Sequence, residues 1–177
     1  QMCIRDSEKS VYTFNELNKR VNSLANAFLG LGMKKGDKVA FLSYNCNQII
    51  EIYFAVAKAG LVNVPLNYRF TPKELLSLIK RCDVKTLIVG HDYLDIINSI
   101  KSELKEVENC ILFGKSNEYE TLISSYPSYK PEVVVNEDDP VCLMHTSGTT
   151  GFPKEAIWTH KNWIAGAKDV VIKIGIN

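Results

Sequence analysis

Residues 145–154, His-Thr-Ser-Gly-Thr-Thr-Gly-Phe-Pro-Lys, hold the densest set of groups in this sequence that could bind an anion. Gly148 and Gly151 let the backbone turn through positive φ, so that several N–H groups can point into one concavity. Lys154 adds a mobile positive charge of the kind that suits phosphate. Hydroxyl donors come from Thr146, Ser147, Thr149 and Thr150. A loop with these donors is typical of a nucleotide triphosphate site.

Two common motifs with similar residues do not fit this segment. The Walker loop G-x-x-x-x-G-K-[ST] cannot be laid on it, because position 153 is Pro and position 155 is Glu. A hydrolase nucleophile at Ser147 would need glycines two residues before and two residues after it, where this chain has His145 and Thr149. A Gly/Ser/Thr-rich surface turn that binds nothing is the remaining structural alternative.

The run Thr-Ser-Gly-Thr-Thr-Gly-x-Pro-Lys resembles the phosphate loop of the adenylate-forming superfamily, which includes acyl-CoA synthetases, luciferases and peptide-synthetase adenylation domains. Shorter stretches upstream follow in the order that this family shows, and with the loop they cover roughly residues 11 to 165. These stretches are Thr13-Phe14-x-Glu16-Leu17, Lys35-Gly36-Asp37-Lys38-Val39, Lys58-Ala59-Gly60 and Val64-Pro65-Leu66-Asn67. The chain is most similar to acyl-CoA synthetases.

The resemblance implies an ATP-dependent carboxylic acid–CoA ligase, and we expect its substrate to be a fatty or related acid. A carboxylate attacks the α-phosphate of ATP, and coenzyme A thiolate then displaces AMP from the acyl-adenylate. The loop would hold the β- and γ-phosphates, Lys154 would neutralise charge, and Thr146 matches a position that approaches Mg²⁺ in some relatives. The implied phosphate-binding residues are Thr146, Ser147, Gly148, Thr149, Thr150, Gly151 and Lys154.

Two alternatives stay open at this point. One is an adenylation domain that loads a carrier protein, and the other is a non-catalytic nucleotide-binding pseudoenzyme. We expect residues 8–177 to be the N-terminal part of an AMP-binding domain and residues 1–7 to be a non-native leader. The family's catalytic lid lysine has no counterpart here, so no catalytic residue is assigned and the fragment itself is expected to be inactive.

Composition narrows the class of protein. Twenty-one basic and twenty acidic residues leave a net charge of +1, which gives no indication of a nucleic-acid partner. No apolar run is long enough for a transmembrane segment. Five widely spaced cysteines without a C-x-x-C pair, and only three histidines, indicate reduced, buried thiols rather than a metal site. We therefore expect a cytoplasmic protein that binds small molecules.

Helical and strand-like segments alternate along the chain, which predicts an α/β fold with a mostly parallel sheet and helices on both faces. Capping-box patterns start helices at Thr13 and Thr71, and the latter has Pro72 at the first helical position. Glycines 30, 32 and 60 are candidates for helix ends. Helices are predicted over residues 13–32, 47–59, 71–82, 92–105, 118–126 and after 160, and strands over 37–44, 61–66, 85–90, 110–113 and 141–145.

Three residues near the loop have specific expectations. His145 could contact nucleotide, although a ring that fills the end of the strand is the better interpretation. His160 is expected to cap the last helix rather than to act in catalysis. Residues 156–159 are β-prone, and side chains alternate faces along a strand, so Glu155 should point away from the phosphates if Lys154 points toward them.

Overall fold

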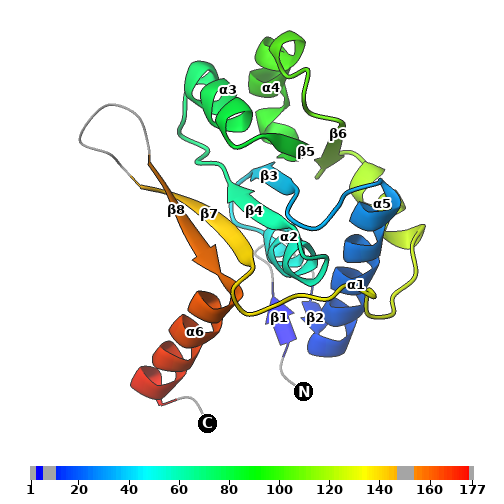
Figure 1. The fold of residues 1–177 in the computed structure, drawn as a ribbon. Helices are drawn as coiled ribbons and strands as arrows, with labels where there is room; N and C mark the ends of the chain where they lie inside the picture. Colours follow the sequence, from blue (N-terminus) through cyan, green and yellow to red (C-terminus); the bar gives the residue numbers. More distant parts are fainter. Residues whose placement is uncertain (1–2, 6–10, 147–153, 176–177) are drawn as a thin grey trace.

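The computed structural model describes residues 3–5, 11–146 and 154–175. Within them, six strands form one sheet in the order β6-β5-β3-β4-β7-β8 (Figure 1). Every neighbouring pair is parallel except β7 and β8, which are antiparallel. These strands are β3 (Lys38–Leu42), β4 (Val62–Pro65), β5 (Val84–Gly90), β6 (Asn109–Phe113), β7 (Pro140–Thr146) and β8 (Lys154–Thr159).

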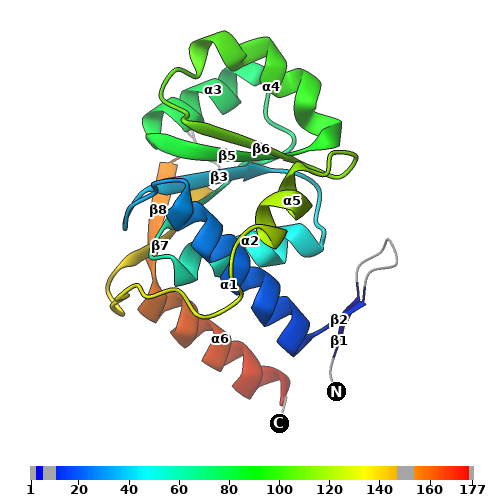
Figure 2. The same ribbon diagram turned by 90° about the vertical axis from the view of Figure 1, so that its right-hand side faces the viewer.

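Helices cover both faces of the sheet, as the alternation of elements predicts. Figure 2 shows α3 and α4 on one face and α1, α2 and α5 on the other. Alternation along β3 explains the two cores: Val39 and Phe41 face α1, α2 and α5, whereas Ala40 and Leu42 face α3 and α4. The helices are α1 (Phe14–Gly30), α2 (Asn47–Lys58), α3 (Pro72–Arg81), α4 (Leu94–Ile100), α5 (Glu118–Ser124) and α6 (His160–Ile174).

The predicted helix starts are confirmed at the two capping boxes. In α1 the hydroxyl of Thr13 accepts the N–H of Glu16, whose carboxylate accepts the N–H of Thr13. Thr71 and Glu74 do the same for α3. Just after the C-terminus of α2, Gly60 has φ +69, a conformation that favours glycine, and a Cβ there would also press on Val133 Cγ1 at 3.1 Å.

Two helix predictions need correction. The segment 92–105 is not one helix but a 3₁₀ turn η1 (His91–Tyr93), then α4, then a second turn η2 (Lys101–Glu103). Ser99 donates its hydroxyl to the Ile96 carbonyl, a local bond that competes with regular helix geometry. The cap of α6 is Thr159, whose hydroxyl accepts the N–H of Asn162, and His160 is the first helical residue.

The expectation of buried cysteines holds for some of them. Cys82 and Cys142 are buried, Cys46 is intermediate, and Cys110 is exposed because it lies on β6, at the edge of the sheet. Residues 3–5 form β1 (Cys3–Arg5), which pairs antiparallel with β2 (Val11–Thr13). Among the residues described, no helix is long and apolar enough to span a bilayer.

Candidate functional site

The predicted phosphate loop joins two strands that are paired with each other. In the β7–β8 register, Thr146 lies opposite Lys154 and His145 lies opposite Glu155. Thr146 is therefore the last residue of β7 and Lys154 is the first residue of β8, with an exposed side chain. The other predicted phosphate-binding residues, Ser147, Gly148, Thr149, Thr150 and Gly151, lie outside the described residues.

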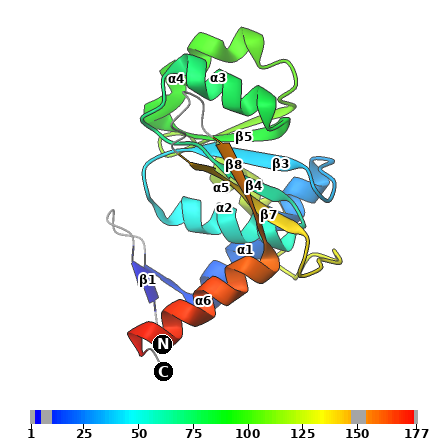
Figure 3. The ribbon, with the colours of Figure 1, turned by 60° about the vertical axis from the view of Figure 1, so that its left-hand side comes forward.

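Strand β7 is anchored to the sheet by buried contacts near its start. Val141 and Cys142 are fully buried, and Asn63 of β4 donates its side-chain amide to the Val141 carbonyl at 3.0 Å. Asn63 is itself completely buried and donates to the Tyr53 carbonyl at 3.3 Å as well. One end of the hairpin is thus fixed in the core, while β8 runs along the outer edge of the sheet (Figure 3).

The segment that leads into β7 is also held in place. Asn26 of α1 donates to the carbonyls of Pro127 and Tyr129, both at 2.9 Å. Lys35 pairs with Asp139 at 2.6 Å, directly before β7 begins. This lysine, together with the Asn136 N–H, lowers the pKa of Asp139. These contacts fix the position of the segment that precedes β7, and thereby the start of β7 itself.

Both described flanks of the loop are strands, as the sequence predicts. Helix α6 begins only after β8, so its N-terminus follows the hairpin at the end away from the loop. An anion held by this loop would therefore depend on backbone N–H groups, hydroxyls and Lys154 rather than on a helix dipole.

Glu155 forms an ion pair with Arg81, a residue that belongs to none of the sequence motifs. Arg81 ends α3, and its Nε and Nη2 both lie 2.5 Å from Oε1 of Glu155. The two side chains remain 37% and 28% exposed. The pair joins residues 74 positions apart, and no pattern in the sequence marks such a contact.

His145 is half-buried and faces Cys82, the residue that follows α3. Its Nε2 lies 3.8 Å from the Sγ of Cys82. Burial lowers the pKa of His145, although the Pro65 backbone and the Glu155 carboxylate oppose that change. The imidazole is therefore neutral at neutral pH. Burial, together with the nearby Glu155 carboxylate, raises the pKa of the Cys82 thiol to about 11.

A tyrosine cluster lies just beyond the carboxyl ends of β3, β4 and β5. Ring centroids are 5.0 Å apart for Tyr44 and Tyr68, and 5.3 Å apart for Tyr44 and Tyr93. The guanidinium of Arg69 lies 5.5 Å from the centre of the Tyr68 ring. The carboxyl ends of parallel strands lie side by side, so residues that follow different strands come together there. In open α/β folds, ligands bind beyond these carboxyl ends. The cluster was not expected from the sequence, because its members follow three different strands.

Comparison with known proteins gives consistent matches. Residues 2–176 match the AMP-binding enzyme family. The acyl-CoA ligase sidI of Beauveria bassiana is 32% identical over an alignment of 171 residues that covers 89% of this chain and 30% of that protein. The fatty acid–[acyl-carrier-protein] ligase ScoC of Streptomyces coeruleorubidus is 28% identical over 171 residues, 96% of this chain and 32% of ScoC.

A solved structure matches the fold closely. The anthranilate CoA ligase AuaEII, crystallised with anthranoyl-AMP, superposes with a TM-score of 0.86 and is 26% identical. The match covers 91% of this chain and 31% of AuaEII. The chain thus spans about a third of the length of these relatives. The shared fold confirms the predicted α/β architecture with its mostly parallel sheet.

Proposed function

This chain belongs to the AMP-binding enzyme family, and from that membership we propose that it contributes the ATP phosphate-binding loop to an ATP-dependent carboxylic acid–CoA ligase. The reaction has two steps. A carboxylate first attacks the α-phosphate of ATP, which gives an acyl-adenylate and pyrophosphate. The thiolate of coenzyme A then displaces AMP and gives the thioester. A fatty or related acid is the proposed substrate class.

One observation carries the proposal: the run of glycines, hydroxyls and Lys154 connects two strands whose ends are paired. Thr146 and Lys154 lie opposite each other, so both ends of this run are held at one place on the sheet. A segment with this composition can direct several backbone N–H groups at one anion, which is how a phosphate is held. Lys154, at the start of β8, adds a charged donor.

The loop residues would act by positioning and by charge neutralisation. Thr146 through Gly151 would hold the β- and γ-phosphates, so that the departing pyrophosphate is stabilised as its charge grows. Mg²⁺, for which Thr146 is the proposed contact in this chain, would neutralise part of the same charge. Holding the α-phosphate in line with the attacking carboxylate makes the reaction of the two bound substrates effectively unimolecular, which lowers its entropic barrier.

A second acceptor has support from one relative. ScoC, which covers nearly all of this chain, is named for transfer to an acyl-carrier protein rather than to coenzyme A. The first half-reaction is the same for both acceptors, and only the thiol that displaces AMP differs. Carrier-protein loading is therefore the alternative function, and it would use the same phosphate loop.

The proposal is tested with a protein that carries this chain together with the remaining length of its relatives. Exchange of labelled pyrophosphate into ATP is measured with a panel of carboxylic acids, and product formation is then compared for coenzyme A and for a carrier protein. Acid-dependent exchange supports adenylation, and the preferred acceptor separates the two functions. Absence of exchange with every acid would leave only a nucleotide-binding role.

Lys154→Ala is the residue-level test of the loop. We expect it to lose about 1.5–3 kcal/mol of transition-state stabilisation, the scale of a hydrogen bond to a charged group. That corresponds to roughly a tenfold to hundredfold lower kcat/KM for ATP. Lys168→Ala, which removes an exposed lysine from α6, is the matched control and should change little. Equal effects of the two substitutions would contradict the role given to Lys154.

A further inference from the structure

Three side chains able to bind a metal converge beside the β7–β8 hairpin. Cys82 follows α3, His145 lies on β7 and Glu155 lies on β8. Their sulfur, nitrogen and oxygen atoms all lie within 4.8 Å of one another. The thiol is buried, the imidazole is half-buried and the carboxylate is partly exposed, so an ion could reach the group from the Glu155 side.

The separations are close to those that a tetrahedral ion requires. With Zn–S of about 2.3 Å and Zn–N of about 2.0–2.1 Å, sulfur and nitrogen ligands lie about 3.6 Å apart. Here Cys82 Sγ is 3.8 Å from His145 Nε2 and 4.0 Å from Glu155 Oε1. The ligand atoms of the third pair, His145 and Glu155, lie within 4.8 Å of each other, so an ion would bind after side-chain rotations that shorten the three separations.

The types of ligand select the class of ion. A thiolate and an imidazole suit zinc and related transition metals, whereas Mg²⁺ and Ca²⁺ prefer oxygen ligands alone. A neutral imidazole is the form that binds a metal, and His145 Nε2 faces the Cys82 sulfur. Three protein ligands leave one tetrahedral position for water.

Charged residues around the three side chains both favour and oppose the binding of a metal ion. The Arg81 guanidinium donates to Oε1 of Glu155. A metal ion would therefore have to share this carboxylate with Arg81 or displace the Arg81 side chain. Arg81 and Lys38 lower the pKa of the Cys82 thiol, but burial and Glu155 outweigh them. A metal must therefore expel the thiol proton as the metal–sulfur bond forms, and this makes binding tighter at higher pH.

We propose that Cys82, His145 and Glu155 form a binding site for a divalent transition-metal ion of the zinc type. The bound ion would link α3, β7 and β8. His145 and Glu155 are one position from Thr146 and Lys154, so the ion would fasten the two strands where the phosphate loop begins and ends. Metal binding does not depend on the ligase activity proposed above.

Cobalt titration of the purified, reduced and metal-free protein tests the site. We expect one equivalent of Co²⁺ to produce a thiolate-to-cobalt charge-transfer band and the intense visible bands of tetrahedral cobalt. Zn²⁺ should displace the cobalt and abolish both signals. Each ion bound should release one proton from the thiol, measured in weak buffer, and affinity should rise as the pH is raised from 6.5 to 8.

Matched variants identify the ligands. We expect a loss of at least tenfold in Zn²⁺ affinity for each of three variants: Cys82→Ser, Cys82→Ala and His145→Gln. Removing a group that only orients a ligand already lowers metal affinity by about tenfold or more. Cys110→Ser removes an exposed thiol elsewhere and should leave binding unchanged. Arg81→Gln should tighten binding several-fold, since it frees the Glu155 carboxylate. Circular dichroism checks that each variant is folded.

Several outcomes would overturn the site. A charge-transfer band that survives both Cys82 substitutions, or disappears with Cys110→Ser, would assign the metal to another thiol. An octahedral cobalt spectrum with no proton release would exclude thiolate ligation. No binding of Co²⁺ or Zn²⁺ by the folded protein, with or without the Arg81→Gln substitution, would show that the three side chains only pack together.

Discussion

At the scale of single residues, Glu155 decides how much negative charge stands near the loop. A carboxylate about 6 Å from the phosphates would cost roughly 3 kcal/mol per unit charge at an effective dielectric near 20. The structure instead shows this carboxylate paired with Arg81, which offsets its charge.

From this pairing we predict that Glu155→Gly changes the KM for ATP by less than about threefold, under ~1 kcal/mol. The variant is assayed in the longer protein with Mg²⁺ as the only divalent cation. A tenfold improvement in ATP use by Glu155→Gly would mean that the carboxylate faces the nucleotide.

His145 should make stability depend on pH. Because burial lowers its pKa in the folded state below the ordinary 6.5, the unfolded chain binds a proton more readily. The stabilising contribution of the neutral imidazole is complete above pH 6.5 and is lost as the pH falls through the lowered folded-state pKa.

We therefore predict that the free energy of unfolding falls less between pH 7.5 and 5.5 in His145→Gln than in the parent chain. Urea titrations at each pH measure it. His160, whose pKa burial also lowers, is present in both proteins and cancels in the comparison. An identical fall in both proteins would show that His145 titrates normally.

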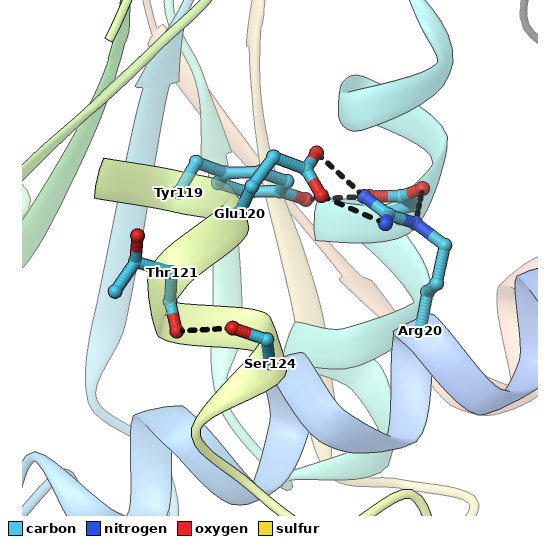
Figure 4. Close-up of polar contacts among 6 residues, drawn as sticks. Arg20, Tyr119, Glu120, Thr121 and Ser124 are labelled. Atoms are coloured by element: carbon cyan, nitrogen blue, oxygen red, sulfur yellow. Dashed lines mark hydrogen bonds and ion pairs between the residues drawn. The ribbon is translucent and has the colours of Figure 1, made fainter. Parts of the chain in front are cut away.

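At the scale of elements, α1, α2 and α5 are joined by one charged cluster (Figure 4). Glu51 of α2 is fully buried and accepts Arg20 Nε at 2.6 Å and the Tyr119 hydroxyl at 2.9 Å. Arg20 also binds both oxygens of Glu120. Burial raises the pKa of Tyr119 well above 10, so it stays a neutral donor to the Glu51 carboxylate.

Removing the cation of this cluster should be costly. Arg20→Gln leaves Glu51 as a buried, uncompensated charge, which costs about 3–5 kcal/mol. Glu120→Gln removes the partner that is 50% exposed and should cost less than about 1 kcal/mol. Urea unfolding of the two variants measures the difference. Similar, small effects would show that water compensates the charge of Glu51 in the variant.

At the scale of the whole molecule, α6 and β8 carry a large apolar surface. None of the residues of α6 is buried, and Ile172 and Ile174 are 79% and 66% exposed. In the part of the chain that the structure describes, β8 is an edge strand, and edge strands tend to pair with other molecules. Exposed apolar patches and open edges promote association between molecules.

We predict that the purified chain self-associates and that changing both Ile172 and Ile174 to lysine reduces the association. Sedimentation velocity at several concentrations measures it. The free energy of unfolding should change by less than about 0.5 kcal/mol, because surface substitutions of this kind rarely do more. Lys161→Ala, on the same helix, is the control. A monomer at all concentrations would contradict the prediction.

Much of the architecture could be predicted from the sequence alone, because it depends on neighbours along the chain. Capping boxes at Thr13 and Thr71, and glycines 32 and 60 with positive φ, act within a few residues. Residue types also define the phosphate-loop motif, and the alternation of elements predicts an α/β sheet. Two helix predictions are wrong in detail. The segment near Ser99 is not one continuous helix, and the Ser99 side chain bonds the Ile96 carbonyl. The N-cap of α6 is Thr159 rather than His160.

Only the tertiary structure decided what meets across the sheet. The strand order β6-β5-β3-β4-β7-β8 does not follow the sequence, and it places β7 and β8 near the end of α3. Cys82 thereby meets His145, 63 residues away, and Arg81 meets Glu155, 74 residues away. Spacing along the chain does not encode such contacts, because they depend on which strands pair and which face each helix covers.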